Sequence, residues 1–140
     1  ADNEYDPNDY RQLLEAAEDN KNTAVYGNRF SKGFVNGMTI KQKAGNLIMT
    51  ALFNILMGEK LRDMETCYKM FPREGIDPAN LQSTGFGIDP EITARLIKSG
   101  LRIKEIPISY YPRPYEAGKK IKLKDAFITF LTIIKYSIWL

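Results

Sequence analysis

Residues 44–58 read AGNLIMTALFNILMG, and this stretch carries the clearest structural pattern in the chain. Its apolar side chains recur at intervals of three and four residues, the spacing of one face of an α-helix, and Met49 and Phe53 widen the stripe. Gly58 suits the left-handed position that ends many helices. We therefore expect a long helix that ends at Gly58 and buries a broad face formed by Ala44, Leu47, Ile48, Ala51, Leu52, Ile55 and Leu56.

Helical and strand patterns alternate on both sides of this helix. The Asp-Pro pairs at residues 6–7 and 89–90 are typical of helix starts, since Asp can cap and Pro suits the first helical position. Such alternation indicates an α/β chain with a mixed or parallel sheet. Besides the long helix, we expect helices over residues 7–20, 89–100 and 126–140, and strands over residues 23–26, 66–71 and 103–111.

The last of these strands has informative side chains. Ile106 and Ile108 fall on one face and Glu105 falls on the other. Pro107 cannot donate a backbone hydrogen bond, which indicates an edge position or a bulge.

Composition excludes several kinds of active site. The chain has 140 residues, enough for one domain or a piece of one. It contains no His, which excludes His-based triads and zinc sites built on His. Cys67, the only Cys, excludes an internal disulfide, and a lone thiol favours the cytosol. A net charge of +3 is too small to suggest a dedicated nucleic-acid binder.

The charges are unevenly placed along the chain. Residues 1–20 carry seven acidic residues and one basic residue, whereas residues 98–125 carry eight basic and three acidic residues. The two segments are either solvated faces, or an acidic part that holds a cation and a basic part that holds phosphate or an anionic surface.

The expected sheet is too small for the expected helices. Three short strands cannot cover both the long helix and the apolar segment 126–140, and sheets of parallel type need both faces covered. The chain is therefore either part of a larger domain or a subunit that assembles with copies of itself. No signal peptide opens the chain, and the uncharged run 126–134 is too short to span a bilayer.

Several motifs together resemble one enzyme family. In this order and spacing they are similar to the family 2 glycosyltransferases, which have the GT-A fold, and above all to dolichyl-phosphate mannose synthases and bacterial polyprenyl-phosphate glycosyltransferases. The motifs are ADNEYDP at residues 1–7, VYGNRF at 25–30, the helix around residues 45–54, DMETCYK at 63–69, FGIDPEIT at 86–93, and IPISY at 106–110 with Arg113, Gly118, Lys119 and Lys120.

The resemblance covers only the second half of such a domain. The family's Rossmann-like first half binds the nucleotide and precedes an Asp-x-Asp motif, whose second acid matches Asp2. The resemblance therefore implies the C-terminal, acceptor-side half of a GT-A domain over residues 1–125, with a mixed sheet flanked by helices and the nucleotide-binding half absent. Residues 126–140 would form an apolar helix suited to a membrane interface.

The first acids are candidate metal ligands. Asp2 and Glu4 lie at i and i+2, so they point to the same side of an extended segment. The resemblance implies that Asp2 binds a metal and that Glu4 stands where the family usually has Gln or Glu. A hard cation, Mg²⁺ or Mn²⁺, would neutralise the charge of the departing nucleoside diphosphate.

Asp63 is the candidate catalytic residue. It follows the long helix in a loop before a strand, and the resemblance implies that it faces the acceptor. It could act as general base on a sugar hydroxyl, or orient a phosphate acceptor that needs no base. Glu65 would be its neighbour on the same side of an extended segment.

Basic residues are the candidate phosphate ligands. Arg29 follows a strand closed by Gly27 and Asn28, and loops after strands often hold ligand contacts in α/β enzymes. The resemblance implies that Arg29 contacts the donor's phosphates or sugar, and that a loop with Arg113, Lys119 and Lys120 closes over the diphosphate or meets a lipid phosphate. Asp89 and Glu91 are explained by helix capping and by the helix dipole.

The resemblance implies an inverting, metal-dependent glycosyltransferase in cell-wall or glycan biosynthesis. It would move a sugar from a nucleotide-sugar to a polyprenyl or dolichyl phosphate or to a glycan, in the cytoplasm or at the inner face of the membrane, with no nucleic-acid partner. The alternative is a non-catalytic membrane-surface or interaction module, built from the basic loop and the apolar helix. We expect a homo-oligomer, or a chain that lacks its N-terminal half.

Overall fold

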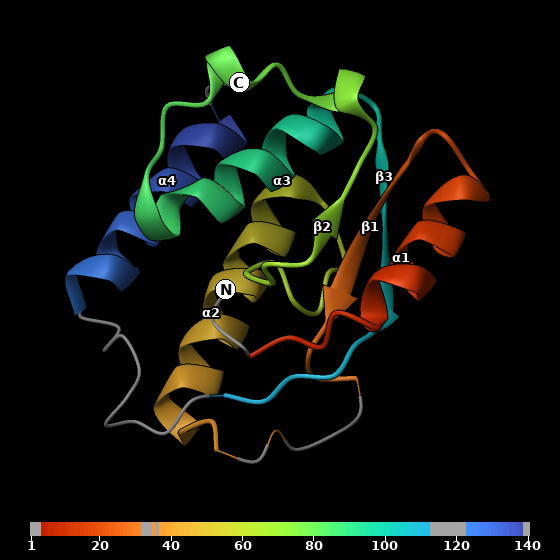
Figure 1. Ribbon diagram of the computed structural model, residues 1–140. Coiled ribbons are helices and arrows are strands. Elements are labelled where there is room, and N and C mark those ends of the chain that lie inside the picture. The colour runs from red at the N-terminus through yellow and green to blue at the C-terminus, as the bar shows by residue number, and fades with distance from the viewer. Residues whose placement is uncertain (1–3, 32–34, 36, 113–122, 139–140) are drawn as a thin grey trace.

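The computed structural model describes residues 4–31, 35, 37–112 and 123–138 (Figure 1). Within these residues, helices flank a three-stranded sheet, with α1 on one face and α2, α3 and α4 on the other side. The mixed sheet flanked by helices is confirmed. The elements are α1 (Asp9–Glu18), β1 (Thr23–Asn28), α2 (Ile40–Met57), β2 (Lys69–Met70), α3 (Ile88–Lys98), β3 (Arg102–Pro107) and α4 (Leu123–Ile138), with short 3₁₀ turns at Arg73–Gly75, Pro78–Asn80 and Gly85–Gly87.

β1 is the central strand of the sheet. It pairs in parallel with β3, from Thr23 opposite Arg102 to Asn28 opposite Pro107, and antiparallel with β2 on its other side. All six residues of β1 are buried, because strands cover both of its edges and helices cover both faces. β3 lies at an edge of the described sheet and ends at Pro107, so the edge position predicted from this proline is confirmed.

Side chains of β1 alternate between two parts of the core. Val25 packs with Leu13 of α1 and with Ile108, on one face of the sheet. Tyr26 points to the other face and packs with Leu96 of α3. This alternation follows from the two-residue period of a strand, and it makes β1 the element that joins the two layers of helices.

The first strand is longer than its sequence pattern indicates. Gly27 and Asn28 do not form a closing turn but are the last two residues of β1. The Gly27 N–H donates to the Tyr68 carbonyl over 2.8 Å. A Cβ at Gly27 would lie 2.6 Å from Ile108 Cδ1, so the close approach of β3's continuation requires glycine here.

α2 forms where predicted but buries a different face. Gly58 has a φ of 72° and ends the helix, as expected. The predicted apolar stripe, however, lies largely on the solvent side: Ile48 is 62% exposed and Ile55 is 79% exposed. The buried residues are Asn46, Thr50 and Phe53. The expectation of a broad buried stripe is therefore wrong, because Phe53 and its polar neighbours face α4 and the loop after α2, and nothing in the described residues covers the opposite face.

Two helix starts and one strand also differ from the sequence pattern. α1 begins at Asp9, and Asp6 instead accepts a hydrogen bond from the Asn8 N–H. α3 begins after Gly87, and Asp89 lies inside its first turn, where it pairs with Lys69 rather than capping the helix. The strand expected over residues 66–71 is reduced to β2, because only Lys69 and Met70 pair with β1.

α4 packs beside α2 and α3 through one side only (Figure 1). Ile133 and Tyr136 are buried in the core cluster with Phe53. Phe127 is 59% exposed and Leu131 is 48% exposed on the outer side. In the described part of the chain, none of the helices is both long enough and apolar enough to cross a membrane.

Candidate functional site

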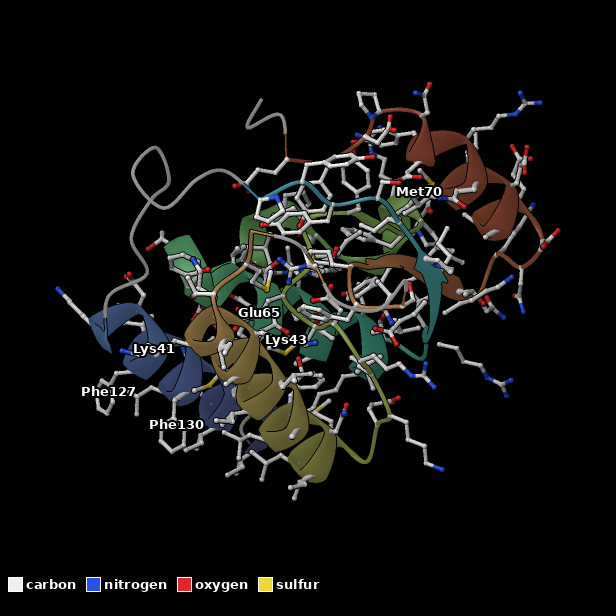
Figure 2. All side chains as sticks on the ribbon, turned by 90° about the horizontal axis from the view of Figure 1, so that it is seen from below. Lys41, Lys43, Glu65, Met70, Phe127 and Phe130 are labelled. Atoms are coloured by element: carbon white, nitrogen blue, oxygen red, sulfur yellow. The ribbon has the colours of Figure 1, made fainter. Side chains whose placement is uncertain are left out.

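The candidate site lies at the carboxyl ends of the parallel strands. β1 and β3 end at the same edge of the sheet, where α/β proteins commonly bind ligands. Arg29 directly follows β1, and Tyr110 comes shortly after β3. Figure 2 looks onto this end of the molecule, with Glu65 near the middle of the view and Phe127 and Phe130 at its margin.

Asp63 and Arg29 form a buried ion pair at this edge. The Arg29 backbone N–H and Nε donate to Asp63 Oδ2 over 3.0 and 2.8 Å, and Nη2 donates to Oδ1 over 2.6 Å. Asp63 is fully buried, and the Arg29 side chain is 9% exposed. A forked pair of this kind is strong and fixes the guanidinium plane. Asp63 therefore orients Arg29, while Arg29 Nη1 is not engaged by Asp63.

The loop after α2 is held so that Asp63 points at Arg29. Asn54 of α2 binds both backbone groups of Leu61, at 2.8 and 3.0 Å. Glu105 of β3 accepts a hydrogen bond from the Asp63 N–H over 2.8 Å and further bonds from the Arg62 N–H. A side chain on a helix and a side chain on a strand thus position the loop, which gives Asp63 a defined place.

The charge of Arg29 is stabilised by its surroundings. Burial lowers the pKa of the guanidinium, but the hydrogen bonds and charge of Asp63 raise it, and the net shift is upward. The Arg29 Cζ atom lies 5.5 Å from the ring centre of Phe30 and 5.2 Å from that of Tyr110, within range of cation–π attraction. Arg29 is therefore a fixed positive charge at the end of the sheet.

Glu4 lies next to this charge through Tyr110. The Tyr110 hydroxyl donates to Glu4 Oε2 over 3.3 Å, and the Tyr111 N–H donates to the Glu4 carbonyl over 2.8 Å. Carboxylate oxygens of this kind suit Mg²⁺ or Mn²⁺. Among the described residues there is no group of three or more His, Cys, Asp or Glu placed to hold a metal ion. Asp2 lies outside the described residues, so the metal site stays a prediction to which the Glu4 side chain is chemically suited.

A second ion pair lies close to the first. Lys69 of β2 pairs with Asp89 of α3, and Lys69 Nζ also donates to the Thr66 carbonyl over 2.6 Å. The ammonium lies 5.2 Å from the ring centre of Tyr26. The Lys69 side chain is 5% exposed, so this charge is at least as buried as that of Arg29, whose side chain is 9% exposed.

The charges of both ion pairs act on Glu65. Its carboxyl has a pKa raised to about 7, first by burial and then by the negative charge of Asp89, with a smaller contribution from Asp63. The positive charges of Arg29 and Lys69 oppose this shift. Burial and the nearby carboxylates thus favour the protonated form of the Glu65 carboxyl.

Glu91 has a structural role. Its buried carboxylate accepts hydrogen bonds from the Ser83 N–H over 2.6 Å, from the Gln82 N–H over 3.0 Å and from Arg95 Nε over 2.9 Å. Burial alone would raise the pKa of Glu91, but these hydrogen bonds lower it to about 2. Glu91 thus anchors residues 82–83 to α3.

The structure brings together three of the residues selected from the sequence: Arg29, Asp63 and Glu4. Arg113, Lys119 and Lys120 lie outside the described residues, as does Asp2, so their roles stay predictions. Sequence reasoning missed the positioning residues Asn54, Glu105, Tyr110 and Lys69. Glu105 had a weak signal, since it is the one acid in a strand whose other charged residues, Arg102 and Lys104, are basic. The partner of Lys69 is 20 residues away and had none.

Comparison with known proteins points to one class of enzyme. The chain is 29% identical over 135 residues to "Glycosyltransferase AglJ" of Haloferax volcanii, covering 96% of this chain and 44% of that protein. It is 27% identical over 120 residues to "Low-salt glycan biosynthesis hexosyltransferase Agl6" of the same organism, covering 84% of this chain and 29% of that protein. The chain thus spans less than half the length of the curated relatives it matches.

No protein-family model matches the chain, and no solved structure matches it significantly. The relationship therefore depends on the two archaeal sequences, which align with nearly the whole chain. The chain is a distant homologue of archaeal glycosyltransferases.

Proposed function

We propose that this chain is the acceptor-side part of an inverting, metal-dependent glycosyltransferase, a hexosyltransferase of glycan biosynthesis. It acts on a nucleotide-sugar donor and on a lipid phosphate or glycan acceptor. The observation that carries the proposal is the Arg29–Asp63 pair, a buried and oriented positive charge at the carboxyl ends of two parallel strands. This is the position at which α/β enzymes bind charged ligands, and a guanidinium charge fixed in place by Asp63 suits an anionic phosphate.

In this proposal Arg29 contacts the phosphates of the donor, and Arg113, Lys119 and Lys120 add further positive charge. Asp2 and Glu4 would hold Mg²⁺ or Mn²⁺, which would neutralise charge on the leaving diphosphate. Asp63 keeps the two roles that the sequence allows, as general base or as an orienting group. Its three hydrogen bonds from Arg29 support the orienting role.

We further propose that nucleotide binding depends on a part of a longer protein beyond these 140 residues. The lengths of the two relatives support this, because each is more than twice as long as the matched region. Calorimetry with uridine and guanosine nucleotide-sugars and Mn²⁺ tests the idea. The 140-residue chain should bind neither tightly and the full-length protein should bind one of them. Micromolar binding by the 140-residue chain alone would contradict it.

A second candidate function is attachment to a membrane surface. The observation that favours it is the outer side of α4, where Phe127 and Leu131 are one helical turn apart and both exposed. Lysines precede these residues in the sequence, and a basic, amphipathic segment of this kind can bind an anionic interface.

Co-sedimentation with phosphatidylserine vesicles, compared with phosphatidylcholine vesicles, tests this second function. Phe127→Ser combined with Leu131→Ser should release the chain from anionic vesicles. Tyr10→Ser is a matched control, since Tyr10 is a 56% exposed aromatic residue on α1, on the other face of the sheet. Equal binding by all three proteins would exclude α4 as the contact.

A further inference from the structure

Four consecutive backbone N–H groups in the loop after α2, those of residues 61–64, are all bound by side chains. The acceptors are Asn54 for residue 61, Glu105 for residues 62 and 63, and Thr50 for residue 64, at N···O distances of 2.8–3.3 Å. Backbone N–H groups that are shielded from water need such partners. The side chains of α2 and β3 therefore determine the path of this loop.

Glu105 holds the part of the loop that carries Asp63. The parallel register places Glu105 opposite Tyr26 of β1. Ile103, two residues earlier on β3, packs against the core cluster that includes Phe53 of α2, so Glu105 lies on the same face of the strand. From there Oε1 accepts a hydrogen bond from the Asp63 N–H over 2.8 Å, and Oε2 accepts one from residue 62 over 2.9 Å.

The same loop residue connects Glu105 to the charge at the candidate site. The Asp63 N–H is bound by Glu105, and the Asp63 carboxylate accepts three hydrogen bonds from Arg29, at 2.6, 2.8 and 3.0 Å. A shift of the Asp63 backbone would move its carboxylate, and the Arg29 guanidinium would follow. Two contacts thus separate β3 from the guanidinium plane.

We propose that Glu105 is a positioning residue for the donor phosphates, which acts through Asp63 on Arg29 and does not itself touch the substrate. The inference rests on the proposed function, in which Arg29 contacts the phosphates of the nucleotide-sugar. It adds a residue of β3 to that site and assigns it the orientation of the guanidinium.

The chemistry of the contact requires a carboxylate at residue 105. Burial raises the pKa of Glu105 more than the hydrogen bonds from Asp63 and Arg62 lower it, so the ionised group costs stability. An amide would avoid this cost, but it has one acceptor oxygen and an N–H₂ donor. In Glu105→Gln the amide nitrogen would replace either Oε1, 2.8 Å from the Asp63 nitrogen, or Oε2, 2.9 Å from the Arg62 nitrogen. In both orientations a donor would face a donor.

The kinetic test uses Glu105→Gln in the full-length protein, with uridine and guanosine nucleotide-sugars and Mn²⁺. Glu74→Gln is the matched control, because Glu74 is exposed on the 3₁₀ turn Arg73–Gly75. The donor KM of Glu105→Gln should rise roughly tenfold with the acceptor KM unchanged, since a misplaced group loses up to about 10²-fold per 1 Å. The control should match the wild type.

A double-mutant cycle tests the route through Asp63. In an Asp63→Asn background Arg29 has already lost its charged partner, so adding Glu105→Gln should change the donor KM less than it does in the wild type. Independent, additive effects of the two substitutions would mean that Glu105 acts by another route, and would overturn the inference.

A readout without catalysis uses the 140-residue chain and remains available if the Asp63 variant does not fold. The Arg29 Nε–H donates to Asp63 and is nearly buried, so its NMR signal should exchange slowly with D₂O. Glu105→Gln should speed this exchange, whereas Glu74→Gln should not. Melting temperatures show whether each variant is folded. Unchanged exchange in folded Glu105→Gln would contradict a positioning role.

The outcomes separate this inference from the proposed function. If the wild type transfers sugar and Glu105→Gln keeps its donor KM, Glu105 does not position the donor but the glycosyltransferase proposal stands. If the wild type uses no nucleotide-sugar, the proposed function fails and the donor role of Glu105 fails with it. The Arg29 Nε–H exchange then still decides whether Glu105 orients Arg29.

Discussion

A single buried ion pair accounts for the position of the charge at the site. Asp63 is fully buried, and its two oxygens accept hydrogen bonds of 2.6 and 2.8 Å from the Arg29 guanidinium and one of 3.0 Å from the Arg29 backbone N–H. Removing one partner of such a pair leaves the other charge in a medium that solvates it poorly. Asp63 therefore matters to the fold as well as to the site, and a loss of activity in its variants must be compared with their stability.

Asp63→Asn keeps the shape of the side chain and removes its charge. We expect the free energy of unfolding to fall by about 3–5 kcal/mol, because Arg29 stays buried without its counter-ion. Chemical denaturation measures the change, and Glu15→Gln, which affects an exposed pair with Arg11, is the control that should change little. In the full-length protein, an orienting role predicts a higher donor KM, whereas a general-base role predicts lower kcat with donor affinity kept. An Asp63→Asn protein with wild-type stability and activity would contradict both roles.

At the scale of the element, α2 shows which parts of the fold can be derived from sequence. Its existence and its end at Gly58 follow from periodicity and glycine chemistry, as predicted, but its start at Ile40 lies before the predicted pattern, which begins at Ala44. The buried face of α2 was not predicted, because its apolar residues are numerous enough to form two stripes and the sequence does not show which stripe is buried. Tertiary contacts select the stripe with Phe53, and they also bury Thr50, whose Oγ1 accepts a hydrogen bond from the Met64 N–H over 3.3 Å.

Two substitutions on α2 test this choice of face. Phe53→Ala should cost about 3–5 kcal/mol of unfolding free energy, because Phe53 is fully buried in the core cluster with Ile133. Ile55→Ala also removes a large apolar side chain, but Ile55 is 79% exposed, so its cost should stay within about 0.5 kcal/mol. Urea titration of both variants gives the two values. Equal costs would mean that α2 is turned differently from this structure.

The Glu91 anchor on α3 predicts a pH dependence of stability. Its folded-state pKa of about 2 is below the ordinary value of 4.5, so its stabilisation is present above pH 4.5 and is lost as pH falls toward 2. Glu91→Gln should lower stability at pH 7 and should flatten this part of the pH curve. Thermal unfolding between pH 2 and pH 7 measures both. If the stability of Glu91→Gln falls between pH 4.5 and pH 2 as steeply as that of the wild type, other carboxyl groups cause the loss of stability in acid.

The candidate site could be predicted in part, and the reason lies in sequence separation. Arg29 and Asp63 were selected because they follow predicted elements, but their contact joins residues 34 positions apart. The pair of Lys69 with Asp89 and the bond from Asp63 to Glu105 are equally non-local. Such contacts depend on the order of strands in the sheet, which periodicity does not determine.

At the scale of the whole molecule, the exposed apolar residues gather on the side formed by α2 and α4. Ile48 and Ile55 project from α2, and Phe127 and Leu131 project from α4 (Figure 2 labels Phe127). Contiguous apolar patches above a few hundred Å² are uncommon on monomers. From the sequence we expected more apolar surface than this chain can cover, and the exposure of these residues agrees with that expectation.

This surface predicts association of the 140-residue chain. We expect light scattering to report dimers or larger species at high concentration without detergent. Ile48→Ser combined with Phe127→Ser should shift the chain toward the monomer, whereas Tyr10→Ser on α1 should not. A wild-type chain that stays monomeric at high concentration would contradict the prediction.

The central claim is that Arg29, held by Asp63, binds the donor of a glycosyl-transfer reaction. The most direct measurement is nucleoside diphosphate release from a nucleotide-sugar by the full-length protein in the presence of acceptor. Arg29→Lys keeps the buried charge but cannot form the fork, so kcat/KM should fall about 10–100-fold, the equivalent of roughly 1.5–3 kcal/mol, with Arg11→Lys unchanged. Full activity in a folded Arg29→Lys protein, or no release by the wild type with any nucleotide-sugar, would contradict the claim.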